Sequence, residues 1–270
     1  EYVAKMVEVF REVKRVLRKD GTLWLNLGDS YAGSGGTGSQ FGQIENGLDK
    51  VRPAKPMGVL KPKDLCGIPW RVAFALQADG WWLRQDIIWA KPNPMPESVT
   101  DRCTKSHEYI FLLTKSAKYY FYSEAISEAA IYGDNGSSFE DERDLKVHAG
   151  IGKKRRQTVA RGGFNGKTNV LVGREAFRAI KDWRNKRSVW TITTKPYGDA
   201  HFATFPEEIP LNCIKAGSKE GDTVLDPFSG AGTTAMVAKK LGRSYVGIEL
   251  NPKYVEMSEL RIETECGTLL

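Results

Sequence analysis

The sequence has few of the features that mark membrane, secreted and zinc-binding proteins. It contains no run of about eighteen apolar residues, which a membrane-spanning helix requires. Its four cysteines, Cys66, Cys103, Cys213 and Cys266, lie far apart without C-x-x-C spacing, so we expect neither a disulfide framework nor a zinc site. Residues 1–5 do not have the pattern of a signal peptide. These absences predict a protein of a reducing, cytoplasmic setting, with no membrane partner and no bound metal.

Acidic residues are scarce in one segment, which is correspondingly basic. Between Arg143 and Arg187 the sequence has fourteen Lys or Arg and only three acidic residues, an excess of +11, whereas the whole chain has a net charge of +7. Interleaved Gly, Asn and Thr residues supply donors and acceptors for phosphates and base edges. A solvated basic loop is the alternative, but the concentration of charge favours nucleic-acid contact. The candidate DNA-binding residues are Lys153, Lys154, Arg155, Arg156, Arg161 and Lys167.

Hydrophobic periodicity predicts an α/β protein. Apolar residues recur at spacings of three and four between Val3 and Leu17, which is typical of one face of an amphipathic helix. A second helix is expected to end at Asp79-Gly80, and a third to begin near Pro206. The expected strands are Thr22–Leu27, Trp82–Trp89, Tyr109–Leu113 and Ser188–Ile192.

The stretch from Thr223 to Glu249 has the order of a nucleotide-binding βαβ unit. A short apolar strand is followed by a glycine turn, a helix from Thr233 to Leu241 and a second strand, Tyr245–Ile248. Glycines in the turn let backbone approach a ligand closely, and the helix N-terminus offers free N–H groups to an anion. Glu249, at the end of the second strand, stands where such units hold both ribose hydroxyls.

The turn favours S-adenosylmethionine over a dinucleotide. It opens with Asp226, which would repel a pyrophosphate, and it lacks the full G-x-G-x-x-G pattern. S-adenosylmethionine has no phosphate but has a sulfonium, an ammonium and one carboxylate. An acid at the strand end suits its cationic side, and the amides near Thr233 and Thr234 suit its carboxylate. A tight strand–helix turn in an unrelated α/β protein is the alternative.

These motifs resemble those of DNA methyltransferases that methylate exocyclic amino groups. The resemblance is in Asp-Pro-Phe-Ser-Gly-Ala-Gly-Thr-Thr at 226–234, Gly-Ile-Glu-Leu-Asn-Pro at 247–252 and His-Phe-Ala-Thr-Phe-Pro at 201–206. Their order resembles the β group of that family, found in prokaryotes and phages as part of restriction–modification systems. It implies a catalytic half at 1–122, a target-recognition region at 123–187 and a cofactor half at 188–270. Double-stranded DNA is the implied partner, and a homodimer is left open.

The resemblance also implies a fold and a set of site residues. The fold is a doubly wound, mostly parallel, seven-stranded Rossmann-like sheet with one antiparallel strand near Tyr109–Thr114, from which a small basic lobe projects. The proline-rich stretch 90–96 and the pair His107-Glu108 would help to wall the pocket of a flipped base; the pair is no zinc motif, because H-E-x-x-H requires histidine where Phe111 stands. The implied cofactor-binding residues are Asp226, Pro227, Phe228, Gly230, Gly232, Thr233, Thr234, Glu249 and Asn251, with Ala203, Thr204 and Phe205 at the methionine end.

One expected motif is missing. Enzymes of this group have a Pro-Pro-aromatic loop that holds the target amino group, and the sequence contains no Pro-Pro dipeptide. We expect that loop upstream of Glu1. Within the sequence, Asp29 is the candidate catalytic residue, although the residues around it include no proline and follow a different strand. The implied reaction is methyl transfer from S-adenosylmethionine to a flipped base. Sequences like this one favour cytosine N4; adenine N6, an RNA methyltransferase and a non-catalytic DNA-binding relative remain the alternatives.

Overall fold

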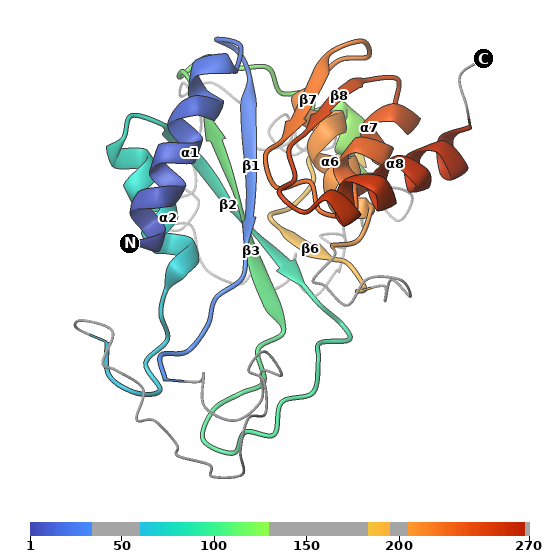
Figure 1. Cartoon of the computed structure of the whole chain (residues 1–270). Coiled ribbons are helices and arrows are strands. Elements are labelled where there is room, and N and C mark those ends of the chain that lie inside the picture. Colours follow the sequence, from blue (N-terminus) through green and yellow to red (C-terminus); the bar gives the residue numbers. More distant parts are fainter. Residues whose placement is uncertain (34–59, 130–182, 195–204, 268–270) are drawn as a thin grey trace, which may run out of the picture. The chain divides into compact units, whose positions relative to one another are not determined.

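The computed structural model describes residues 1–33, 60–129, 183–194 and 205–267 (Figure 1). The chain divides into two compact units. The larger consists of residues Glu1–Tyr122 and Arg187–Leu270, and the smaller of Ser123–Lys186. None of the helices within the described ranges is long and apolar enough to cross a membrane.

A four-stranded sheet forms the centre of the larger unit. Its order is β1 (Thr22–Leu27), β3 (His107–Thr114), β2 (Trp82–Ala90) and β6 (Val189–Thr191). The strand β3 runs antiparallel to both β1 and β2, and β6 runs parallel to β2. The antiparallel strand predicted at Tyr109–Thr114 is therefore confirmed.

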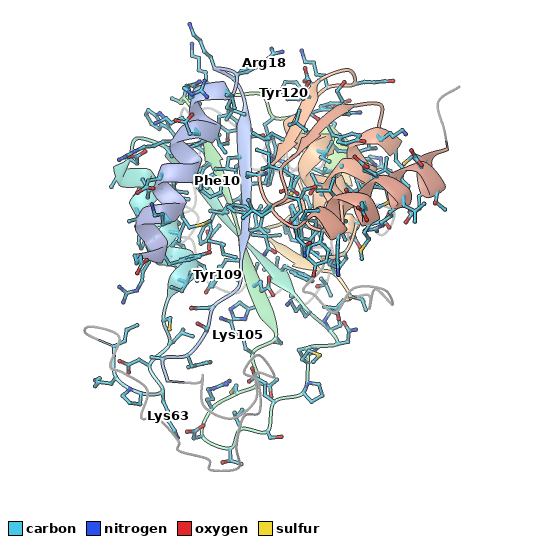
Figure 2. All side chains as sticks on the ribbon, in the orientation of Figure 1. Phe10, Arg18, Lys63, Lys105, Tyr109 and Tyr120 are labelled. Carbon is cyan, nitrogen blue, oxygen red and sulfur yellow. The ribbon has the colours of Figure 1, made fainter. Side chains whose placement is uncertain are left out.

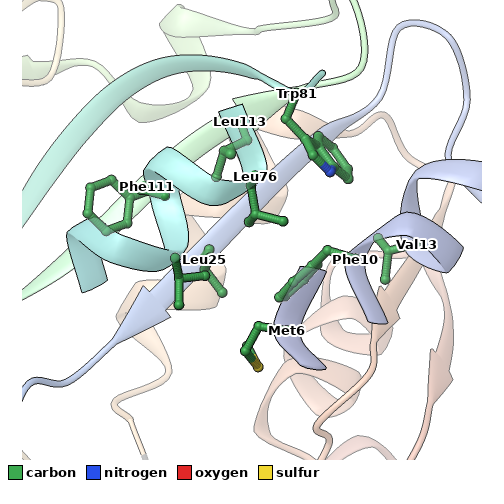
Figure 3. Packing of buried hydrophobic residues seen from close by; sticks show 10 residues of the cluster. Met6, Phe10, Val13, Leu25, Leu76, Trp81, Phe111 and Leu113 are labelled. Atoms are coloured by element: carbon green, nitrogen blue, oxygen red, sulfur yellow. The ribbon is translucent and has the colours of Figure 1, made fainter. Parts of the chain in front are cut away.

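Helices cover both faces of this sheet, so β3 buries side chains on both sides. On one face, α1 (Tyr2–Val16) and α2 (Ile68–Ala78) pack against it, and Figure 3 shows Leu76 between Phe10 and Phe111. On the other face, Ile110 belongs to a second cluster with side chains of β2, β6 and α6 (Glu208–Gly217). Successive strand residues point to opposite faces, so neighbours such as Ile110 and Phe111 serve different clusters.

The predicted βαβ unit is also present. It consists of β7 (Thr223–Asp226), α7 (Thr233–Lys240) and β8 (Ser244–Gly247), with the two strands parallel. A further helix, α8 (Pro252–Cys266), contributes Ile262 to a cluster with α7. The sequence pattern did not predict α8, because Ile262 is its one buried residue and its apolar periodicity is faint.

A single, mostly parallel, seven-stranded sheet is not confirmed. Within the described residues the strands form sheets of four, two and two, and the four-stranded sheet is mixed. The reason is pairing: β7 pairs with β8, β1 pairs with β3, and no described ladder joins the two sets. In the smaller unit, a short 3₁₀ helix, η1 (Ser123–Ile126), precedes the antiparallel pair β4 (Glu128–Ala129) and β5 (Trp183–Arg184).

Candidate functional site

Two glycines shape the turn between β7 and α7, for different reasons. Both have positive φ angles, +49° at Gly230 and +74° at Gly232. A Cβ atom added to Gly230 would meet nothing within 4 Å, whereas one added to Gly232 would lie 2.6 Å from Cβ of Ser258 in α8. Gly232 therefore lets α8 pack closely, and Gly230 leaves space where a ligand can approach.

Glu249 lies over this turn. One oxygen of its carboxylate, Oε2, accepts a hydrogen bond from the backbone N–H of Gly230 at 2.9 Å, across nineteen positions of sequence. The other, Oε1, accepts from the N–H of Asn251, also at 2.9 Å. Each carboxylate oxygen has a second lone pair, so both oxygens can still accept a bond from a hydroxyl donor. The structure thus brings Glu249, which is predicted to hold the ribose, to Gly230 of the predicted cofactor turn.

Asp226 ends β7 and begins the turn. Its Oδ1 accepts a hydrogen bond from the N–H of Phe228 at 3.0 Å, which closes a local turn. The ring of Phe228 lies 6.4 Å from that of Phe10 in an edge-to-face arrangement, yet 55% of the residue is exposed. Pro227 lies between Asp226 and Phe228 in sequence and is half-buried. The carboxylate of Asp226 and a largely open aromatic ring thus flank the turn.

The N-terminus of α7 has no side-chain cap. Its N-cap residue is Gly232, which has no side chain, so the first N–H groups of the helix are open to an anion. Thr233 is buried, and its Oγ1 accepts a hydrogen bond from Nη1 of Arg261 at 2.9 Å, so this hydroxyl faces α8. Thr234 is half-buried. The predicted carboxylate site is therefore one of backbone amides.

Two further predicted cofactor residues have structural contacts. Two other cofactor residues and all the predicted DNA-binding residues lie outside the described ranges. Asn251 is the N-cap of α8, where its side chain accepts from the N–H of Lys253 at 3.1 Å. Phe205 packs against the cluster that contains Trp190 and Ile209. The predicted residues outside the described ranges are Ala203, Thr204, Lys153, Lys154, Arg155, Arg156, Arg161 and Lys167.

A second polar cluster lies at the ends of β1, β2 and β3. Lys91 forms an ion pair with Glu108, and their side chains are 19% and 24% exposed. The Nδ2 of Asn26 donates to Oε2 of Glu108 at 3.2 Å and to the carbonyl of Tyr109 at 3.1 Å. Nζ of Lys91 also lies 4.2 Å from the centre of the Trp89 ring. The glutamate of the predicted pocket wall is therefore held by a cation and an amide.

Asp29 is buried beside this cluster, with 4% of its side chain exposed. Its Oδ1 accepts from the N–H groups of Ser30 and Ile68 at 2.9 and 3.0 Å, and Oδ2 lies 4.0 Å from Nζ of Lys105. Figure 2 shows Lys105 and Tyr109 at the opposite end of the sheet from Arg18. These contacts position the start of α2, and a catalytic role for Asp29 stays a prediction.

Comparison with known proteins adds independent findings. A family model described as DNA methylase matches residues 1–260. The type II methyltransferase M.Cfr9I of Citrobacter freundii is 46% identical over 267 residues, covering 98% of this chain and 72% of the relative. The type II methyltransferase M.SmaI of Serratia marcescens is 44% identical over 263 residues, covering 97% of this chain and 74% of the relative.

Solved structures show the same fold. The putative DNA modification methylase TTHA0409 of Thermus thermophilus, solved in complex with S-adenosyl-L-methionine, aligns with a TM-score of 0.57 at 20% identity over 99% of this chain and 79% of that chain. The cytosine-N4-specific PvuII DNA methyltransferase aligns with a TM-score of 0.58 at 18% identity over 97% and 70%. The likeness shows a Rossmann-like methyltransferase fold.

Proposed function

The chain belongs to the family of DNA methylases that modify exocyclic amino groups, is S-adenosylmethionine-dependent, and, we propose, methylates N4 of cytosine in double-stranded DNA. Adenine N6 is the second candidate acceptor. Mass analysis of the methylated base distinguishes the two amines.

The observation that supports the cofactor site most directly is the contact between Glu249 and Gly230. It places a carboxylate with two free lone pairs beside a turn that has open space at Gly230. We assign the ribose hydroxyls to Glu249 and the carboxylate of the methionine moiety to the uncapped amides of α7. Asp226 lies on the same turn and suits the cationic part of the ligand.

The reaction needs no covalent enzyme intermediate. The acceptor nitrogen forms a bond to the methyl carbon while the carbon–sulfur bond breaks, and the electron pair of that bond stays on sulfur. The products are S-adenosylhomocysteine, the methylated base and one proton released from the amine. The enzyme contributes by holding the two reactants in line and by flipping the base out of the duplex.

We assign DNA recognition to the basic segment between Arg143 and Arg187. Its excess of positive charge supports this, since neutralised phosphates dominate the affinity of proteins for DNA.

We also propose that β7 and β8 belong to one sheet with β1, β3, β2 and β6 in the working enzyme. Leu225 of β7 supports this, because it packs against the cluster formed by α1, α2 and the sheet.

Methyl transfer from labelled cofactor tests the proposal. The full-length protein should transfer a tritiated methyl group to unmethylated duplex DNA and not to RNA of the same sequence. Nuclease digestion and mass analysis of the product should then show 4-methylcytosine. Finding 6-methyladenine would assign the other acceptor, label in RNA would overturn the DNA substrate, and DNA binding without transfer would indicate a non-catalytic relative.

A further inference from the structure

Arg261 reaches the cofactor turn from the side of α8. Its side chain is only 9% exposed, although it is a charged group. The guanidinium nitrogen Nη1 donates to Oγ1 of Thr233 at 2.9 Å and to the carbonyl oxygen of Ala231 at 3.4 Å. The N–H of the same Ala231–Gly232 peptide donates to the carbonyl of Ser229 at 2.9 Å. Both ends of this peptide are thus held, and one of them is held by Arg261.

The same guanidinium also reaches the segment that follows Phe205. Nη2 of Arg261 lies 3.6 Å from Oε1 of Glu207, which is the N-cap residue of α6. Phe205, two positions earlier, is one of the residues assigned to the methionine end of the cofactor. Arg261 therefore links two cofactor segments that are distant in sequence, the glycine turn and the chain leading into α6.

Two more charges complete a closed network. Nζ of Lys240, at the end of α7, lies 3.5 Å from Glu207 and 2.7 Å from Glu265. Nε of Arg261 donates to Glu265 at 3.2 Å. Hydrogen bonds from Lys240 and Arg261 lower the pKa of Glu265, and the bond to Glu265 raises the pKa of Lys240. The pairing of Lys240 with Glu265 thus favours the ionised form of each of these two groups.

We propose that Arg261 is a positioning residue for S-adenosylmethionine. Arg261 holds the glycine turn in place relative to the segment at Phe205, through its ion pair with Glu207. The proposal rests on the cofactor site assigned above. Its physical basis is the planar, rigid fork of the guanidinium, which can bond the carbonyl of Ala231, the hydroxyl of Thr233 and a carboxylate at once. A lysine has the charge but cannot reproduce this set of contacts. The close contact of Ser258 with Gly232 brings α8 near enough for the fork to reach.

Calorimetric titration of S-adenosylmethionine into full-length variants tests this assignment. Arg261→Met should weaken binding roughly 10-fold, because the turn loses a support that sets its geometry. Arg261→Lys should fall between Met and the wild type. The matched control is Arg243→Met, which removes another partly buried arginine whose bonds go to Ser218 and Leu241, away from the turn. It should lower the melting temperature without changing cofactor affinity.

Kinetics separate positioning from general stability. In Arg261→Met, the KM for cofactor should rise while kcat at saturating cofactor stays close to that of the wild type, because the residue does not contact the reacting atoms. Glu207→Gln, at a half-exposed position that should not impair folding, should raise the KM in the same direction by a smaller factor. Unchanged cofactor affinity in Arg261→Lys and Glu207→Gln, or a loss in Arg243→Met equal to that in Arg261→Met, would overturn the inference alone. A wild-type protein that does not bind S-adenosylmethionine would instead overturn the cofactor site itself.

Discussion

Replacing Glu249 is the most direct test of the cofactor site. Its carboxylate accepts hydrogen bonds from the N–H groups of Gly230 and Asn251, so the side chain is held in place without a ligand. Two more lone pairs are available for the two ribose hydroxyls. Glu249→Ala removes the anionic acceptor altogether, and Glu249→Gln replaces one of its oxygens with a donor group that faces a backbone N–H.

The magnitude follows from the charge of the acceptor that the substitution removes. Hydrogen bonds to a charged group contribute about 1.5–3 kcal/mol, which is roughly 10- to 150-fold in affinity. Glu249→Ala should therefore weaken S-adenosylmethionine binding by about that factor. Glu249→Gln should weaken it at least as much, because the amide opposes the N–H of either Gly230 or Asn251 and disturbs the turn. Asp226→Ala should weaken binding as well, through loss of negative charge beside the cationic ligand.

Calorimetry with two ligands distinguishes the roles. S-adenosylhomocysteine has the same ribose but no sulfonium charge, so Glu249→Ala should reduce the affinity for both ligands by a similar factor. Glu259→Ala, at an exposed glutamate of α8, is the matched control and should leave both affinities unchanged. Wild-type affinity for S-adenosylmethionine in both Glu249→Ala and Asp226→Ala would refute the assignment of this turn as the cofactor site.

Three other perturbations test separate parts of the molecule. Neutralising the four basic residues 153–156 should weaken DNA binding and reduce the log–log salt slope by about 0.9 for each phosphate that is no longer neutralised, while cofactor binding is retained; an unchanged slope in fluorescence titrations would contradict this. Burial raises the pKa of the Cys213 thiol, so a thiol reagent should modify exposed Cys103 rapidly and Cys213 only after unfolding, as peptide mass mapping would show. A hydrogen bond from Arg11 lowers the pKa of Asp79 in the folded protein. The pair should therefore stabilise the fold above the ordinary pKa of an aspartate, about 4, and this stabilisation should be lost as the pH falls through the lowered pKa of Asp79. Arg11→Met should accordingly reduce stability in urea unfolding at pH 7, and a difference from wild type that persists undiminished in strong acid would contradict the pairing.

Local periodicity and turn chemistry were enough to predict most of the elements. The spacing of Met6, Phe10 and Val13 determines one buried face of α1, because residues three and four apart share a helix face. The strand–glycine–helix–strand order from Thr223 to Gly247 depends only on residues close in sequence, and the structure reproduces it within a residue or two. The long motif in this stretch also indicated the methyltransferase family, which the family model confirms.

Tertiary structure decided what residues distant in sequence do for one another. The positive φ of Gly232 belongs to the local turn, but α8 also packs Ser258 against this glycine, and the local motif does not contain that second requirement. The pairing of Lys91 with Glu108 and the reach of Arg261 to Thr233 likewise join residues from different elements. Strand pairing was decided in the same way, since hydrogen-bonded ladders depend on which strands become neighbours and periodicity does not encode neighbours. Sequence thus determined which segments form and what chemistry they offer, and packing determined which side chains support the ligand-binding turn.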